Sequence, residues 1–162
     1  MKLLVPLIPL LVFASCGRQK VKETFLIPLG FEGRIDVIFN QPDFPPVPVE
    51  NGRCIYRVPK DGILVTSSKI KKGILNQEYY YVDNKGTKTK IEVKDISNQS
   101  IPDSAVIDDY GYTGVYGSLS DKNPLEYIES ILVSNKTNDS IYNQKNKPAF
   151  LKLIMSKVGR QF

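Results

Sequence analysis

The 162-residue sequence has no histidine, no tryptophan and only two cysteines. Histidine is the most common general base near neutral pH, so its absence excludes Ser-His and Cys-His nucleophile pairs and most zinc sites. Without tryptophan the chain also lacks the largest aromatic platform on which a sugar could stack. No apolar run reaches the roughly 18 residues that a membrane-spanning helix needs.

The composition that remains is typical of a folded protein. Hydrophobic residues make up 41% of the chain and charged residues 24%, which argues against a disordered chain. The length suits one domain with its own core. The net charge of +5 is modest and gives no reason to expect nucleic acid as a partner.

The N-terminus predicts export. A lysine at position 2 precedes the apolar residues 3–13, which are too few to span a bilayer and have the length of a signal-peptide core. The following residues, Phe13-Ala14-Ser15-Cys16-Gly17, resemble the lipobox of bacterial lipoproteins. That resemblance implies removal of a signal peptide, residues 1–15, and acylation of Cys16 with diacylglycerol and palmitate. The alternative is an ordinary secretory signal, which would leave Cys16 as a free thiol or disulfide-bonded to Cys54.

Acylation at Cys16 would place the protein in the cell envelope, anchored to a lipid bilayer. Residues 16–23 carry three basic side chains and no apolar periodicity, so we expect a solvated tether that suits anionic headgroups. No aspartate follows Cys16, which by known sorting preferences favours the outer membrane if the cell is Gram-negative. Cys54 is expected to be a small buried residue on a strand.

Residues 24–93 predict a β-rich domain. Ile35, Val37 and Phe39 alternate with polar residues, as expected for a half-buried strand. The proline-rich residues 41–48 predict an extended connection or an edge, because proline cannot donate a backbone hydrogen bond. The clearest hairpin joins residues 78–82 to residues 88–93 through a turn at residues 83–86. Further strands are expected at residues 24–28, 53–58 and 63–66, with a tight turn at residues 59–62.

Residues 94–162 predict an acidic loop region followed by two helices packed on the same domain. Asn123-Pro124 resembles a helix start, and Leu125, Ile128 and Leu132 recur at helical spacing over about ten residues. A second helix is expected from Lys147-Pro148 to a stop at Gly159. Its apolar residues Leu151, Ile154, Met155 and Val158 would pack on the sheet, with Lys152, Lys157 and Arg160 in water. The predicted fold class is therefore α+β: an antiparallel β-sandwich, transthyretin-like or immunoglobulin-like in shape, followed by two short amphipathic helices.

Several short motifs in the first half of the chain occur together. They are F-L-I-P-x-G-F-x-G from Phe25, P-x-D-G-I from Pro59, T-S-S from Thr66 and Y-Y-Y from Tyr79. With the N-terminal signal, this pattern resembles an uncharacterised bacterial lipoprotein domain family. The resemblance implies a β-rich fold and brings no assigned activity with it.

The tyrosines are the most conspicuous candidates for a ligand or partner surface. On a strand, Tyr79 and Tyr81 share one face and Tyr80 takes the other, and one face must be core. The residues proposed for an exposed surface are Tyr80, Tyr110, Tyr112 and Tyr116. The alternative is that these rings pack against one another across strands.

No catalytic residue, metal site or cofactor is predicted. Ser68 and Lys71 fit an S-x-x-K pattern, but the partner motifs of that enzyme class are absent. A calcium site among Asp103, Asp108, Asp109 and Asp121 is an alternative whose spacing matches no loop motif. We therefore expect a membrane-anchored envelope lipoprotein that acts as a non-catalytic binding or structural module. The alternatives are a small histidine-independent hydrolase and an accessory subunit of an envelope protein complex.

Overall fold

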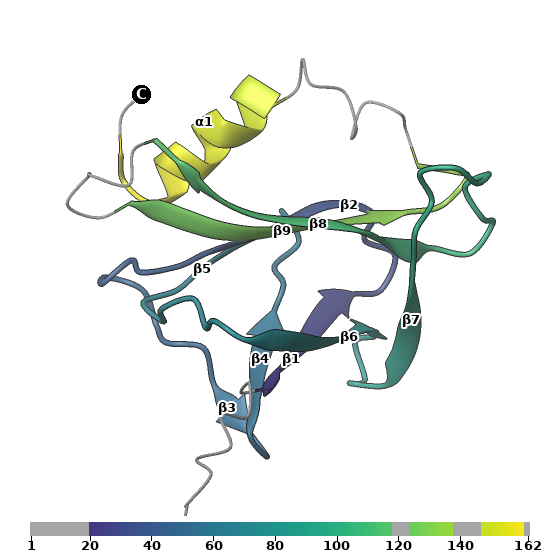
Figure 1. Ribbon diagram of the computed structural model, residues 1–162, viewed down its shortest axis with the longest axis horizontal. Helices are drawn as coiled ribbons and strands as arrows, with labels where there is room; N and C mark the ends of the chain where they lie inside the picture. The colour runs from purple at the N-terminus through teal and green to yellow at the C-terminus, as the bar shows by residue number, and fades with distance from the viewer. Residues whose placement is uncertain (1–19, 118–123, 138–146, 161–162) are drawn as a thin grey trace, which may run out of the picture.

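The structure, a computed structural model, describes residues 20–117, 124–137 and 147–160. These ranges contain nine strands and one helix (Figure 1). The elements are β1 (Lys20–Pro28), β2 (Gly33–Ile38), β3 (Val49–Glu50), β4 (Arg53–Arg57), β5 (Ile63–Val65), β6 (Ile74–Val82), β7 (Lys88–Lys94), β8 (Val106–Tyr116), β9 (Leu125–Val133) and α1 (Lys147–Lys157). Within these ranges the one helix, α1, has 11 residues, which is too few to span a bilayer.

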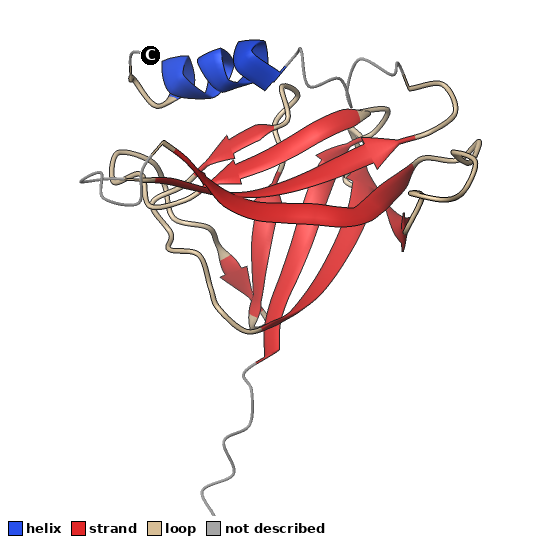
Figure 2. Ribbon diagram, turned by 45° about the horizontal axis from the view of Figure 1, so that its top comes forward, coloured by secondary structure: helices blue, strands red, loops and turns tan. Residues whose placement is uncertain are grey.

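All nine strands belong to one sheet, which curls into a half-barrel. Their order is β3-β4-β1-β6-β7-β8-β9-β2-β5. β7 pairs with β6 through residues 88–91 and then with β8 through residues 92–94. The sheet therefore turns at β7, and the strands before and after it in the sheet order face each other (Figures 1 and 2).

The expected antiparallel sandwich is thus corrected to a single, mixed sheet. Four neighbouring pairs are parallel: β1 with β4, β1 with β6, β2 with β5, and β7 with β8. Parallel neighbours need long connections, so they pair residues far apart in the chain. The β6–β7 hairpin is antiparallel as predicted, and the mainly-β class is confirmed.

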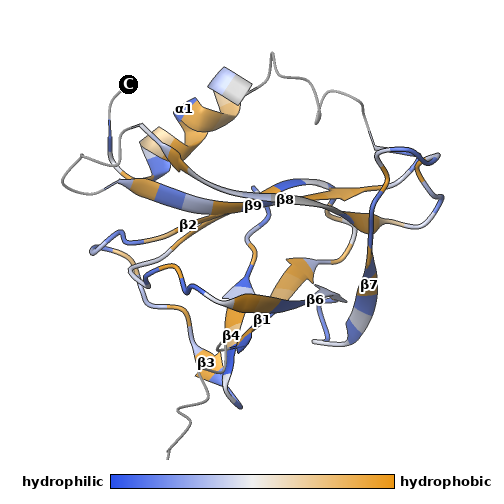
Figure 3. Cartoon of the chain, in the orientation of Figure 1, coloured by the Kyte–Doolittle hydropathy of each residue, from blue (hydrophilic) through white to orange (hydrophobic). Residues whose placement is uncertain are grey.

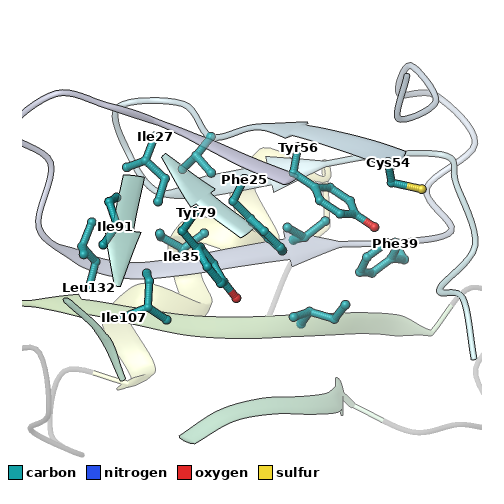
Figure 4. Packing of buried hydrophobic residues seen from close by; sticks show 13 residues of the cluster. Phe25, Ile27, Ile35, Phe39, Cys54, Tyr56, Tyr79, Ile91, Ile107 and Leu132 are labelled. Carbon is teal, nitrogen blue, oxygen red and sulfur yellow. The ribbon is translucent and has the colours of Figure 1, made fainter. Parts of the chain in front are cut away.

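The main core fills the inside of the curl. Phe25 lies between two tyrosine rings, with centroids 4.7 Å from Tyr56 and 4.6 Å from Tyr79 (Figure 4). Other members are Ile27, Ile35, Val37, Phe39, Cys54, Val58, Ile91, Ile107, Ile128 and Leu132. Cys54 is buried as expected. Figure 3 shows β1 coloured as mainly hydrophobic and β7 as mainly hydrophilic, in line with the burial of the one and the exposure of the other.

The predicted helix from Pro124 is wrong, because residues 125–133 form the strand β9. This strand is covered on both faces: Ile128 and Leu132 belong to the main core, while Leu125 belongs to the cluster under α1. A strand buried on both sides loses the alternation of apolar and polar residues. Its apolar residues then match a helical spacing by coincidence. Only one of the two expected helices is present in the described residues.

The second predicted helix is confirmed as α1, and it packs on the outer face of the sheet. Ile154 is fully buried there against Ile38, Ile63, Tyr116 and Leu125. Gly159, at φ 68°, ends the helix. The Gly159 N–H donates to Ser156 O, and the Arg160 N–H donates to Met155 O. These two bonds are the Schellman pattern that favours glycine at this position.

Two boundaries differ from the sequence-based expectation. β1 begins at Lys20, and Val21 and Glu23 are already buried, so the fold takes up the second half of the expected tether, residues 16–23. β8 lies in the stretch expected to be an acidic loop, because Val106 and Ile107 begin a strand that pairs along β9.

Candidate binding groove

A groove lies where the curled sheet is open, between the first half of β6 and the last half of β8. In the described part of the chain, β6 pairs with β7 only from Tyr79 onwards, and β8 pairs with β7 only up to Asp108. Residues 74–78 and 112–116 therefore border a gap between the two halves of the sheet. Such strand edges present backbone donors and acceptors to a ligand.

Two adjoining hollows make up the groove, with volumes of about 410 and 230 Å³. Leu75, Thr113 and Ile128 line both of them. The larger hollow is mainly apolar and has Lys71 and Lys72 in its wall. The smaller one is lined by polar residues such as Gln77 and Ser130 beside apolar ones such as Ile107. An extended ligand with an apolar part would suit this combination.

A chain of hydrogen bonds crosses the inside of the curl beside the smaller hollow. Glu23, on β1, accepts from the Tyr56 hydroxyl at 2.9 Å and from Gln77 Nε2 at 2.8 Å. The Tyr79 hydroxyl lies 3.2 Å from Gln77 Oε1 and 3.1 Å from Ser130 Oγ on β9. This series of hydrogen bonds thus connects the two facing halves of the sheet.

The Tyr56 hydroxyl in this series of hydrogen bonds stays protonated. Burial raises its pKa well above the usual value, and the negative charge of Glu23, which accepts its proton in a hydrogen bond, raises it further. A hydroxyl in this state is a permanent donor and is a poor nucleophile or base. Its role is to hold the Glu23 carboxylate inside an apolar core.

A second polar cluster lies on the outer face of the sheet, beneath α1. Arg34 Nη1 lies 3.1 Å from Glu129 Oε2, and the Tyr116 hydroxyl donates to Asp36 Oδ2 at 2.8 Å. The rings of Tyr116 and Tyr127 stack with centroids 4.1 Å apart. Burial raises the pKa of Tyr116, and the nearby Asp36 carboxylate raises it further.

Gly114 makes room for this stack. A Cβ built on Gly114 would lie 2.8 Å from the Tyr127 hydroxyl oxygen and 3.0 Å or less from its ring carbons. Real Cβ atoms do not approach other atoms so closely, so the Tyr127 ring can cross β8 only over a glycine.

Of the four tyrosines proposed for a common surface, the three whose side chains the structure describes do not come together. Tyr112 is 57% exposed and lines the smaller hollow. Tyr116 is buried under α1 and serves packing, not a surface. Tyr80 is half-buried, and its hydroxyl donates to Glu78 Oε2 at 3.2 Å. The side chain of Tyr110 lies outside the described residues.

The residues considered for catalysis, metal binding and lipidation lie in different parts of the molecule or outside the described residues. Asp108 and Glu129 line the smaller hollow with Ser130. The Ser68 hydroxyl accepts a hydrogen bond from the Val47 N–H at 2.9 Å. Among the described residues no group of three or more cysteine and acidic side chains is placed to hold a metal ion. Cys16, Asp121 and the side chain of Asp109 lie outside the described residues.

The sequence-based reasoning did not identify Glu23, Gln77 and Ser130 as members of a site. Glu23 fell within the predicted tether. The available signal was its position between Val21 and Phe25, because a charged residue at an alternate position of an apolar strand points into the core.

Comparison with known protein families identifies the family to which this chain belongs. A family model described as "Family of unknown function (DUF6843)" matches residues 19–144, which is most of the chain. The chain belongs to this family. The DUF6843 match covers all nine strands and stops just before α1.

A solved structure with a similar fold also bears on this DUF6843 protein. It is a crystal structure of a "Putative Lipoprotein from Bacillus anthracis", which superposes with a TM-score of 0.63 at 21% sequence identity. The match covers 86% of this chain and 95% of the other. At this identity the likeness shows a shared fold. No curated protein sequence is similar enough to this chain to count as a match.

Proposed function

We propose that this protein is a bacterial lipoprotein, anchored in the cell envelope by acyl chains on Cys16, whose domain binds a ligand or partner without catalysing a reaction. The observation that carries the proposal is the position of Cys16. It follows an apolar signal-like stretch and stands four residues before β1 begins. A lipid attached there would hold a complete domain directly beside a bilayer.

The energetics of acyl chains support a lasting anchor. Each buried methylene contributes about 0.8 kcal/mol, so two or three chains hold a protein on a membrane where one chain would be marginal. The lipoprotein description of the structural neighbour agrees with this location. In a Gram-negative cell the residues after Cys16 favour the outer membrane, because none of them is the aspartate associated with retention at the inner membrane.

The groove supports a binding role. It is open, it has a large apolar hollow, and it is bordered by two strand edges. The hydroxyls of Tyr56 and Tyr79 are engaged in hydrogen bonds with Glu23, Gln77 and Ser130. An arrangement of this kind offers a shaped surface for an extended peptide or a lipid-like chain.

Metabolic labelling with palmitate tests the anchor. The wild-type chain and Cys54→Ala are expected to incorporate label and to stay with the membrane fraction, whereas Cys16→Ser loses both properties. Cys54→Ala is the matched control, because it removes the other cysteine of the chain. Intact-mass analysis of native protein that finds an unmodified Cys16 would overturn the proposal.

A hydrolase is the second candidate, favoured by one observation: two acidic residues, Asp108 and Glu129, line the same hollow. The test is the double variant Asp108→Asn/Glu129→Gln, with turnover measured on a panel of glycans and esters. If the wild-type chain turns over a substrate and the variant folds but does not, the non-catalytic role is refuted.

Crosslinking in intact cells tests the third possibility, a subunit of an envelope complex. Recovery of the protein alone would count against it.

A further inference from the structure

One end of the β1–β6 pair combines basic and apolar side chains. Lys20 pairs in register with Ile74, so the first residue of β1 and the first residue of β6 lie side by side. We call this the tether-end patch; it consists of Lys20, Lys22, Lys71, Lys72, Ile74 and Leu75. All six residues are exposed.

The lysines of the tether-end patch are free to meet an external charge. No ion pair within the described ranges involves Lys20, Lys22, Lys71 or Lys72. Ile74 and Leu75 are 48% and 42% exposed, although large aliphatic side chains are usually buried. Basic side chains around exposed aliphatic ones are typical of surfaces that rest on anionic membranes.

The length of the tether decides which end of the domain is nearest the bilayer. Lys20 stands four positions after Cys16, and a fully extended chain spans at most about 14 Å over that distance. The far end of β6, at Val82, lies eight residues from Ile74, or about 26 Å along the strand. That end also carries lysines, Lys88 and Lys90, but the tether cannot bring them to the headgroups while the strands point away from the membrane.

From these observations we infer that the tether-end patch is a membrane-docking surface, which rests on an anionic bilayer and orients the groove relative to it. The inference rests on the proposed lipid anchor for its biological setting. The docking itself depends on Lys71, Lys72 and Ile74, so it can be measured on a chain that has no lipid. Lys71, Lys72 and Leu75 belong both to the patch and to the groove, so the groove opens close to the bilayer surface.

Co-sedimentation with vesicles tests the docking. The probe is residues 16–162 with Cys16→Ser, a chain that contains every described strand and α1. We expect it to bind vesicles of phosphatidylglycerol and not those of phosphatidylcholine. The double variant Lys71→Glu/Lys72→Glu should reduce the partition constant at least about thirtyfold, because each basic residue at the surface contributes several-fold to binding.

The matched control is Lys88→Glu/Lys90→Glu, which makes the same change of charge at the opposite end of β6. Since about 26 Å is three times the Debye length of roughly 8 Å in physiological salt, this variant should weaken binding less than about threefold. Equal losses in the two variants, or no preference for phosphatidylglycerol, would overturn the docking surface. Neither result depends on acylation of Cys16, which the mass of native protein decides separately.

A second measurement uses the anchored protein in phosphatidylglycerol vesicles. Ile74→Cys and Leu153→Cys place a fluorescent label at two sites of matched exposure, 48% and 46%, on β6 and on α1. A nitroxide on the lipid headgroups should quench the label at position 74 several-fold more than the label at position 153. Equal quenching, or stronger quenching at position 153, would overturn the inference while leaving the anchor intact.

Discussion

The core inside the curled sheet and the core under α1 each enclose one carboxylate that accepts a hydrogen bond from a tyrosine. In the inner core Tyr56 donates to Glu23 at 2.9 Å, and under α1 Tyr116 donates to Asp36 at 2.8 Å. Both carboxylates are almost completely buried. A buried charge is costly unless it is hydrogen-bonded, so each tyrosine makes its core tolerable to an acid.

The two sites differ in what they connect. The contacts around Glu23 continue through Gln77 and Tyr79 to Ser130, from one half of the sheet to the other. The hydrogen bond from Tyr116 to Asp36 lies within one half, since β8, β9 and β2 are neighbours. The inner network therefore fixes how the halves face each other, and the outer one fixes the surface on which α1 lies.

Removal of the central ring of the inner core should have the largest effect. Phe25→Ala takes away the ring between Tyr56 and Tyr79, and we expect a loss of about 4 kcal/mol in the free energy of unfolding. Ile154→Ala, the corresponding change under α1, should cost about 3 kcal/mol. Urea unfolding measures both, and Leu153→Ala on the exposed side of α1 is the control, with less than about 0.5 kcal/mol expected.

Both variants should unfold in one transition. β2 belongs to the two cores at once, because Val37 points into the inner core and Ile38 into the core under α1. Damage to either core therefore weakens the shared strand. A separate early transition in Ile154→Ala would show instead that α1 detaches on its own and that the cores are independent.

Loss of a single tyrosine hydroxyl should have an intermediate effect. Tyr56→Phe removes a donor to the buried Glu23, and we expect a cost of about 2 kcal/mol, as for other hydrogen bonds to charged groups. Tyr116→Phe should cost a similar amount. Tyr80→Phe, which loses a bond to the partly exposed Glu78, is the control. Equal costs for Tyr80→Phe and Tyr56→Phe would show that burial of the carboxylate contributes nothing.

The same hydroxyls predict how stability depends on alkaline pH. Burial and the adjoining carboxylate raise the pKa of Tyr56 and of Tyr116, while the unfolded chain releases these protons near pH 10. Above that pH the folded state holds more protons than the unfolded state, so stability falls as the pH rises. Each tyrosine contributes a slope of about 1.4 kcal/mol per pH unit.

Urea unfolding at several pH values between 9 and 11.5 measures this slope. Tyr56→Phe and Tyr116→Phe should each make the decline above pH 10 less steep by the share of one tyrosine, about 1.4 kcal/mol per pH unit. Measurements between pH 6 and 8, where tyrosine does not titrate, give the baseline for each variant. An unchanged slope in both variants would mean that neither hydroxyl is held protonated by the fold.

The sequence predicted the strands whose two faces differ in polarity. Cys54, Tyr56 and Val58 lie at alternate positions of the strand expected at residues 53–58, with arginines at positions 53 and 57, and all three are buried in the inner core. β9 was mistaken for a helix because both of its faces are covered, so its apolar residues carry no period of two. The parallel pairs were not foreseen either, since they join segments such as β1 and β6 that are far apart in the chain.

The candidate site was less accessible to prediction, for a reason visible on β8. Tyr112 pairs with Glu129 and Tyr116 with Leu125, so the two rings project from the same face of the strand. Only the Tyr116 end packs in the cluster under α1, and Tyr112 is left exposed. Strand periodicity indicates which residues share a face, but not how far along that face a distant helix will extend.

The smallest expected effect tests whether α1 is held over the outer core by charge or by apolar packing. Lys157 Nζ lies 2.6 Å from Asp61 Oδ2 and 2.8 Å from Ile63 O, contrary to the expectation that Lys157 points into water. Burial alone would raise the pKa of Asp61, but hydrogen bonds from Lys157 and from the Ile63 N–H lower it overall.

Because the pKa of Asp61 is lower in the folded state than its unfolded value near 3.9, the pair stabilises the protein above about pH 4. This stabilisation is lost as the pH falls. Because the pair is partly exposed, Lys157→Met should cost about 0.5 to 1 kcal/mol at pH 7, with the exposed Lys152→Met as control, and the cost should shrink towards zero by about pH 2. A cost that persists at pH 2 would assign the effect to the hydrogen bond from Lys157 to the Ile63 carbonyl, which does not titrate, and not to the ion pair with Asp61.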